Sequence, residues 1–198
     1  PELRLPFPPG DPWQLTHGYL EDTPANELST HIDYGLWADD RFAVDFASSG
    51  CRPWRAPALA AADGIVDVRS AGGPYGRTLF VDHGNGYKTR YAHLDQITVR
   101  NGEFVSRGDQ IGLIGNSGNA QGHICAAHPG THLHFALYHN GVGQRLEPIS
   151  GIRNFAVTAW YRSDNDGNND CHQNTLLGSA PFCSAGCTCA GGEGDCDA

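Results

Sequence analysis

Hydrophobic and polar residues alternate over short stretches along most of the chain between residues 42 and 141. The alternation is clearest in GIVDVRS (64–70), TLFVDH (78–83) and YKTRYAH (87–93). A period of two is typical of strands, because successive side chains of a strand point to opposite faces. Further strand-like runs cover residues 41–47, 97–99, 104–115, 131–141 and 157–161.

Glycine and proline separate these runs, and no long run has helical periodicity. The stretch Gly84-Asn85-Gly86 lies between two of the runs and is a strong signal for a β-hairpin. Residues 1–20 are rich in proline, which excludes a helix there. Runs about ten residues apart with turns between them predict an all-β fold. We expect an antiparallel, sandwich-like core with long loops and a Cys-rich C-terminal tail.

Charge narrows the set of partners. The chain has 13 Lys and Arg against 22 Asp and Glu, a formal net charge of −9, and it contains no basic run. Nucleic acid is therefore not an expected partner, and neither is an anionic membrane surface. No stretch approaches the roughly 18 apolar residues of a membrane span, so we expect no membrane insertion. The sequence starts at Pro1 and has no Met, which indicates a processed or trimmed segment. We expect a monomer.

Cysteines are concentrated at the C-terminal end. Five of the seven lie among residues 171–198, namely Cys171, Cys183, Cys187, Cys189 and Cys196. A segment this short can bury little hydrophobic core, so we expect disulfides to stabilise it. Disulfides form in oxidising compartments, which predicts a secreted protein in an extracellular or periplasmic compartment. A zinc knuckle is less favoured, because no His lies within the cluster and the spacing fits no common zinc site. We place a domain boundary near residue 163, with a domain over 1–162 and the Cys-rich tail or start of an accessory module over 163–198.

Two histidines stand one residue apart in the run GTHLHFALYHNG (130–141). In a strand His132 and His134 share one face, while Leu133, Phe135 and Leu137 form the opposite, core face. Two imidazoles facing a cleft can both bind one metal, or one can bind while the other serves a reaction. Two exposed polar residues are the alternative. A catalytic zinc takes three protein ligands and keeps a fourth position open, so further ligands must come from elsewhere in the chain.

Several motifs in register resemble one family. VDFA (44–47), APALAAADGIVDV (56–68), YGRTLFVDHGNGYKTRYAHL (75–94), VRNGEFVSRGDQIGLIGNSG (99–118) and GTHLHFALYHNG (130–141) follow its order and spacing. The chain resembles the zinc metalloendopeptidases of the lysostaphin, staphylolysin and beta-lytic protease type, which hydrolyse peptidoglycan, and is most similar to the staphylolysin and beta-lytic branch. The resemblance implies a metallopeptidase core of the duplicated hybrid motif type.

The family pattern also implies roles for individual residues. Asp45 and His134 correspond to zinc ligands, and His93 and His132 to catalytic residues. The remaining ligand is a His upstream of the Asp. The lysostaphin spacing of four residues falls on Arg41 and fails, whereas the longer spacing of the other branch favours His31, 14 residues before Asp45. His17 is the competing candidate.

Other residues fit the resemblance less completely. Cys125 matches one end of a disulfide of the beta-lytic branch, but residues 78–83 lack the expected partner. Cys51 is the remaining cysteine of the domain, so a bridge to Cys125 stays open without support from the family pattern. Tyr91 shares the strand face of His93 and is a candidate for oxyanion stabilisation, with an exposed strand tyrosine as the alternative. Asn116 and Ser117 are expected at the rim of the cleft. We interpret His83, His123, His128 and His139 as structural or surface residues.

The resemblance therefore implies a secreted zinc endopeptidase, with one Zn²⁺ per domain, acting on peptide bonds of bacterial peptidoglycan in the stem peptide or the cross-bridge, Gly-Gly bonds included. Zinc would activate a water molecule, and two histidines would handle protons, so activity should be lost at acid pH. Relatives that have lost ligands act as cell-wall-binding or amidase-activating modules, which is the alternative function. Here all five family positions, three for metal ligands and two for catalytic histidines, have a suitable residue, which favours an active enzyme. A third hypothesis makes the Cys-rich tail an adhesion or anchoring module.

Overall fold

The structure is a computed structural model, and it describes residues 1–10, 12–19, 31, 40–48, 51–69, 73–121, 125–149, 152, 153, 155, 159–163 and 165. The predictions for His123 and for the five cysteines of the C-terminal tail lie outside these residues. In the described part of the chain, no helix is long and apolar enough to cross a membrane.

All regular elements within these ranges are strands, which confirms the predicted all-β class. They are β1 (Trp13–His17), β2 (Val44–Ala47), β3 (Pro57–Leu59), β4 (Gly64–Val68), β5 (Arg77–Gly84), β6 (Tyr87–Ile97), β7 (Phe104–Val105), β8 (Gln110–Ile114), β9 (Leu133–His139), β10 (Val142–Gln144) and β11 (Trp160–Tyr161). All pairings between these strands are antiparallel. The predicted hairpin joins β5 to β6, with positive φ angles at Asn85 and Gly86 that suit a tight turn.

Some boundaries differ from those expected from the alternation. The run 104–115 contains two strands, β7 and β8, because a turn at residues 106–109 interrupts it; the Ser106 amide donates to the Asp109 carboxylate there. The run 97–99 is no separate strand, since residue 97 ends β6. Sequence reasoning did not separate β1, β3 and β10 as strands. They have three to five residues each, too few for a distinct periodic signal.

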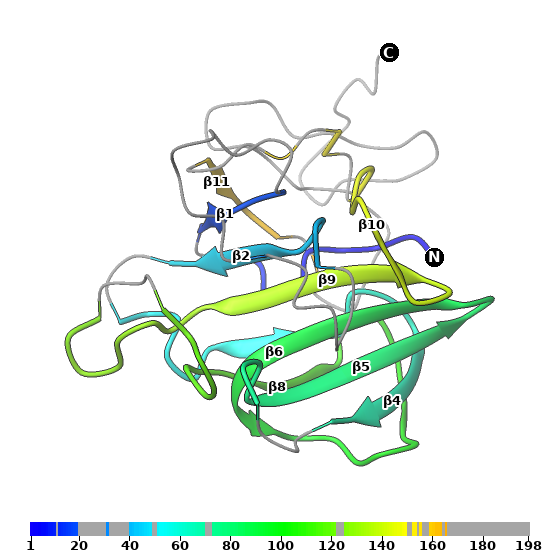
Figure 1. The fold of residues 1–198 in the computed structure, drawn as a ribbon, viewed down its shortest axis with the longest axis horizontal. Helices are drawn as coiled ribbons and strands as arrows, with labels where there is room; N and C mark the ends of the chain where they lie inside the picture. The colour runs from blue at the N-terminus through cyan, green and yellow to red at the C-terminus, as the bar shows by residue number, and fades with distance from the viewer. Residues whose placement is uncertain are drawn as a thin grey trace, which may run out of the picture.

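The sheet order is β11-β1-β2-β9-β6-β5-β4-β7, with β8 pairing with both β6 and β3, and β10 with β9. Figure 1 shows β2, β9, β6 and β5 following one another across the molecule. The long strand β6 divides one of its edges between two partners. Its residues 87–92 pair with β9, and residues 94–97 pair with β8. The change of partner falls at His93, which has a φ of 60°.

The main core lies on one face of β9 and β2. Leu133, Phe135 and Leu137 belong to it, as the alternation predicts. The opposite face of β9 is not an open cleft over its whole length, because Ala136 and Tyr138 form a second buried cluster with Ala43. The cleft on this face therefore reaches only the N-terminal end of the strand, where the two histidines stand.

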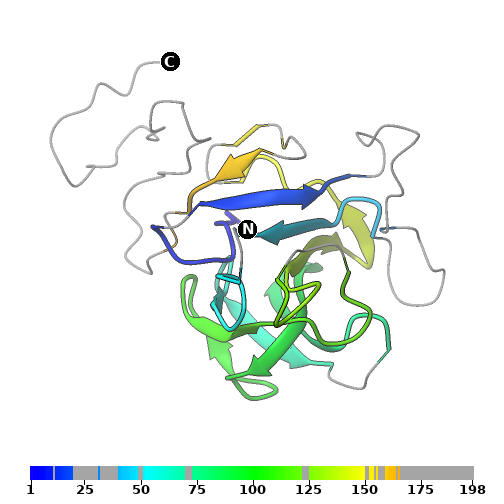
Figure 2. The same ribbon diagram turned by 90° about the vertical axis from the view of Figure 1, so that its left-hand side faces the viewer.

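The N-terminal segment contributes buried side chains to the main core. Leu3, Leu5 and Phe7 are buried in it, and the amide of Arg4 donates to the carbonyl of Ala61. Figure 2 shows β1 between β11 and β2, away from the β4–β5 end of the sheet. Asn165 is also buried, and its amide donates to the carbonyls of Leu5 and Ala60. The chain thus packs on its N-terminal segment at the predicted boundary near residue 163, while the boundary itself stays a prediction.

Candidate metal centre

One row of directly opposed residues crosses three neighbouring strands. His17 of β1 is paired with Asp45 of β2, and Asp45 is paired with His134 of β9. Residues opposite one another in antiparallel strands project their side chains to the same face. Strand register alone therefore brings two of the three predicted metal ligands, Asp45 and His134, side by side.

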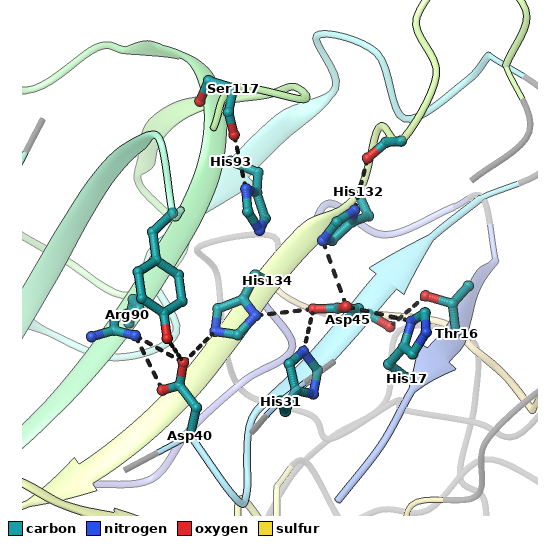
Figure 3. Close-up of polar contacts among 12 residues, drawn as sticks. Thr16, His17, His31, Asp40, Asp45, Arg90, His93, Ser117, His132 and His134 are labelled. Carbon is teal, nitrogen blue, oxygen red and sulfur yellow. Dashed lines mark hydrogen bonds and ion pairs between the residues drawn. The ribbon is translucent and has the colours of Figure 1, made fainter. Parts of the chain in front are cut away.

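Two imidazoles converge on one carboxylate oxygen. His134 Nδ1 and His31 Nε2 each lie 3.1 Å from Oδ1 of Asp45, and all three residues are buried. One donor atom from each lies within 4.8 Å of the others. Figure 3 shows His31 and His134 directed toward Asp45 from two sides. The structure thus brings together all three residues that the family pattern suggests as ligands.

His17 lies beside this triad. Its Nδ1 is 3.5 Å from Oδ2 of Asp45, on the side away from the His134 contact. The ring of His17 is about one-third exposed, whereas that of His31 is almost fully buried. The competing candidate therefore contacts the second carboxylate oxygen, and His31 is the residue that shares Oδ1 with His134.

The two predicted catalytic histidines adjoin the triad and are anchored alike. His93 Nδ1 lies 2.8 Å from the carbonyl oxygen of Ser117, and His132 Nδ1 lies 2.7 Å from that of Gly130. A carbonyl oxygen only accepts hydrogen bonds, so each ring carries its proton on Nδ1. Each Nε2 is then left with a lone pair. The two rings are 4.6 Å apart, centroid to centroid.

A cavity of about 380 Å³ contains these groups. Its lining consists of His17, His31, Asp40, Asp45, Pro74, Tyr75, His93, Asn119, Gln121, His132 and His134. The loop after β8 forms one wall through Asn119 and Gln121, and the backbone of Ser117 holds His93. The expected rim is therefore present on this loop, but Asn116 instead donates to the carbonyl of Pro129.

Burial and charge set the protonation states. Burial above all, together with the neighbouring His132 and His134, lowers the pKa of His93 to about 3. The pKa of His132 is also lowered, by burial above all. Burial alone would raise the pKa of Asp45, but His31, His132 and His134 more than offset this, and its pKa lies well below the ordinary value. Burial likewise opposes the charged form of His134, yet Asp40 and Asp45 raise its pKa to about 9.

Asp40 is a site residue that sequence reasoning missed. It is buried with Arg90, which donates to both of its oxygens at 3.1 and 3.0 Å. The hydroxyls of Tyr75 and Tyr138 also donate to Asp40, and His134 Nε2 lies 3.4 Å from it. The only signal in the sequence is Arg90, a charged residue in the alternating run on the face opposite Tyr91. Asp40 itself stands in a loop, where an acidic residue carries no information about burial.

The predicted role of Tyr91 near the oxyanion is not supported. Tyr91 is buried in the main core, packs against Phe135, and accepts a hydrogen bond from the amide of Ala61 on its hydroxyl. The reason is the positive φ at His93, together with a register shift between β5 and β6 around this position. Simple alternation fails across such an irregularity, so Tyr91 and His93 do not share a face.

The remaining histidines in the described residues have structural contacts, as predicted. His83 is hydrogen-bonded to the carbonyl of Asp63 and to Thr89. His128 stacks on Trp54, and His139 stacks on Tyr87. A disulfide joins Cys51 to Cys125, the pairing that the family pattern left unsupported. This bridge fastens the loop after β2 to the segment that leads into β9.

The donor set fits a zinc ion. Zinc in proteins takes His nitrogen and carboxylate oxygen at about 2.0–2.2 Å in a tetrahedral arrangement, which puts neighbouring donors about 3.3–3.5 Å apart. The two 3.1 Å separations at Asp45 Oδ1 are close to that spacing. Among the described residues Nδ1 of His31 is buried without a hydrogen-bond partner, whereas Nε2 faces Asp45.

Known proteins share this arrangement of sequence and fold. The chain is 41% identical over 99 residues to the Peptidoglycan DD-endopeptidase ShyA of Vibrio cholerae, covering 50% of this chain and 20% of that protein. It is 29% identical over 154 residues to Protease LasA of Pseudomonas aeruginosa, covering 75% of this chain and 32% of that one. A zinc-containing peptidase from Vibrio cholerae superposes with a TM-score of 0.50 at 29% identity, covering 71% of this chain and 39% of that one.

The chain thus spans a fifth to a third of the length of these two relatives. Residues 43–148, more than half of the chain, match Peptidase family M23. The match includes Asp45, His93, His132 and His134, and it begins after His31. It confirms the resemblance and the expected class of enzyme, a metallopeptidase, while the branch within the family stays a prediction. The chain belongs to peptidase family M23.

Proposed function

We propose that this chain is a secreted zinc endopeptidase that hydrolyses peptide bonds of bacterial peptidoglycan. One observation carries the proposal. Three buried donor groups converge at Asp45 Oδ1, and two further imidazoles, those of His93 and His132, adjoin them in the same cavity. A purely structural metal site is closed by protein ligands and needs no such neighbours.

His31, Asp45 and His134 would hold the zinc ion. With Zn²⁺, one carboxylate and two neutral imidazoles would give the centre a net charge of +1. The nearby Asp40 does not change this charge, because it is paired with Arg90. When bound, zinc supplies a Lewis acid that polarises a carbonyl and makes water acidic near neutral pH. The described lining of the cavity contains no glutamate, and its two aspartates are Asp45, a proposed ligand, and Asp40, paired with Arg90, so we assign the proton to an imidazole.

His93 and His132 are suited to that proton transfer. Both are neutral with Nδ1 donating to a backbone carbonyl, so each has an Nε2 lone pair available. One of them accepts on Nε2 the proton that the attacking water loses, and returns it to the nitrogen of the departing amine. The other would accept a hydrogen bond from the attacking water on its Nε2 lone pair and so orient that water.

The names of the relatives support the proposed substrate class. ShyA is named a peptidoglycan endopeptidase, and the cavity has polar walls that suit a peptide. Bonds of the stem peptide and of the cross-bridge, Gly-Gly included, are the proposed targets. We also propose that the protein acts as a monomer and that residues beyond about 163 form a separate Cys-rich tail, stapled by disulfides.

Muropeptide analysis tests the proposed function. Purified protein is assayed for zinc and incubated with isolated peptidoglycan, and the products are identified by mass spectrometry. We expect about one zinc per chain and new amino termini at peptide bonds, both lost in the Asp45→Ala variant. Protein that lacks zinc but still sediments with peptidoglycan would instead support the alternative, a cell-wall-binding or amidase-activating module.

The tail is tested separately. Because Ser163 and Asn165 contact Leu5, a deletion should begin at residue 166 rather than at the predicted boundary. We expect the shortened protein to keep hydrolysis of soluble muropeptides. Loss of binding to whole cell walls alone would identify the tail as an anchoring module.

A further inference from the structure

Asp40 occupies a position that the proposed chemistry does not use directly. It lies outside the strands, yet it is as deeply buried as His134, at 2% exposure for each. Its Oδ2 is 3.4 Å from His134 Nε2, the ring nitrogen that does not face Asp45 and that is buried without a hydrogen bond among the described residues. Figure 3 shows the imidazole of His134 between the two carboxylates, with Asp45 on one side and Asp40 on the other.

The Asp40 carboxylate is itself held from several directions. Arg90 donates to both oxygens, and the Tyr75 and Tyr138 hydroxyls donate to one oxygen each. The Arg90 guanidinium in turn lies over three aromatic rings, at 4.2 Å from that of Tyr75, 4.9 Å from Phe80 and 5.2 Å from Tyr138. This network leaves Asp40 little freedom to rotate away from His134.

A buried ion pair is a weak source of stability, because desolvation of the two charges offsets most of their attraction. Stability alone therefore does not explain why Asp40 and Arg90 are buried together beside His134. Metal-binding histidines commonly donate their second ring N–H to a carboxylate, which fixes the tautomer and the ring orientation. A carboxylate only accepts, so a hydrogen bond from His134 to Asp40 requires the ring proton on Nε2. That tautomer leaves the Nδ1 lone pair directed toward Asp45 Oδ1.

We propose that Asp40 is a positioning residue for the metal centre: it orients His134 for coordination through Nδ1, and Arg90, Tyr75 and Tyr138 hold Asp40 in place. The inference rests on the proposed zinc function. The proposed site then consists of the three ligands and a hydrogen-bonded network behind His134. Through Tyr138 this network includes part of the second buried cluster.

The test measures metal binding rather than turnover. Zinc affinity is determined by competition with a chromophoric chelator, and ligand geometry by the visible absorption of the Co²⁺-substituted protein. The variants are Asp40→Ala and Tyr138→Phe. Thr89→Val is the matched control, because Thr89 is buried in β6 next to Arg90 but bonds to His83 and Tyr91, away from the metal site.

We expect Asp40→Ala to weaken zinc binding by about 10- to 100-fold and to change the cobalt spectrum. Tyr138→Phe should weaken binding less. Thr89→Val should lower the thermal midpoint without changing zinc affinity. A folded Asp40→Ala protein with zinc affinity within about twofold of the wild type and an unchanged cobalt spectrum would overturn the inference, as would equal weakening by Thr89→Val.

A wild-type measurement covers the case in which Asp40→Ala does not fold. In the zinc-loaded protein, ¹H–¹⁵N NMR of the imidazoles should show the His134 proton on Nε2, shifted downfield and protected from exchange with water. A rapidly exchanging proton there would overturn the proposal. Failure of the proposed function looks different, because the wild type would then bind no zinc at all.

Discussion

The ring of His93 lies 4.6 Å from the ring of His132, and each donates its Nδ1 proton to a backbone carbonyl. The two come from different places in the fold. His93 stands where β6 changes its partner strand, and His132 immediately precedes β9. Their Nε2 atoms point into the cavity, and that of His132 lies 3.6 Å from Oδ2 of Asp45, whereas His134 has a carboxylate near each of its ring nitrogens. The two histidines of His-x-His thus have different surroundings, which supports different roles.

Replacement of the individual histidines should separate these roles. We expect His93→Ala and His132→Ala to keep about one zinc per chain and to lower kcat by about 10²- to 10⁴-fold, the contribution of general acid–base catalysis. His134→Ala should lose the zinc itself. Metal content by atomic emission and kcat on a soluble muropeptide give the two measurements. His139→Ala, which removes a histidine stacked on Tyr87 at the far end of β9, should change neither. Equal loss of zinc in His132→Ala and His134→Ala would contradict the division of roles.

The two candidates for the third ligand can be distinguished in the same way. His31→Ala removes a nitrogen 3.1 Å from Asp45 Oδ1, so we expect zinc to be lost from this variant during dialysis. His17→Ala removes a contact of 3.5 Å to Oδ2 and a ring contact with His31, so zinc should remain bound with affinity weakened by about tenfold. Isothermal titration with zinc measures both variants. The opposite ranking would make His17 the ligand.

Acid should inactivate the protein through its ligands rather than through His93. The pKa of His93 is lowered to about 3 by burial, so this ring stays neutral from pH 8 down to pH 5. The pKa of His134 is raised to about 9 in the metal-free protein, so below that pH zinc has to displace a proton. Each displaced proton weakens zinc binding by about tenfold per pH unit as the pH falls.

We therefore expect activity at limiting zinc to fall between pH 7 and pH 5, and the fall to move to lower pH when free zinc is raised. Rates measured at two buffered zinc concentrations across this range provide the check. An acid limb that does not respond to zinc would instead assign the loss to one of the catalytic imidazoles.

The Cys51–Cys125 disulfide should contribute to stability. It links residues 74 positions apart, and closing so long a loop restricts the unfolded chain. We expect the double variant Cys51→Ser/Cys125→Ser to lose about 2–4 kcal/mol in free energy of unfolding, measured by urea denaturation. The comparison is made without reductant, so that the tail cysteines are in the same state in both proteins. Unchanged stability would mean that the bridge does not form in solution.

Alternation predicted much of the fold. It placed β4, β5, β6, β9 and the hairpin correctly, since these strands have one face in the core and five or more residues each. It assigned the faces of β9 correctly because that strand is regular. It failed for Tyr91, because a single residue with positive φ between Tyr91 and the next strand segment reverses the order of the faces.

The site was predictable only where a motif or a strand register defines it. Asp45 and His134 are neighbours across two strands, a relationship that the alternation allowed but could not fix without knowing that β2 pairs with β9. His31 was selected by spacing in the resemblance and not by any local pattern. Asp40 and Tyr75 were missed because both lie in loops, where no periodic pattern marks them. Their role depends on hydrogen bonds with residues distant in sequence, Arg90 and Tyr138, which meet Asp40 only in the folded chain.

The pairing of Asp45 with His134 also bears on how this scaffold can be altered. Two of the three donors are fixed by one strand-to-strand register, and a one-residue slip of either strand would turn one donor to the opposite face. An insertion or deletion within β2 or β9 should therefore abolish the centre altogether. His31 lies outside both strands, so this register does not fix its imidazole. An engineered change of strand register would therefore separate Asp45 from His134 without moving His31 along with either of them.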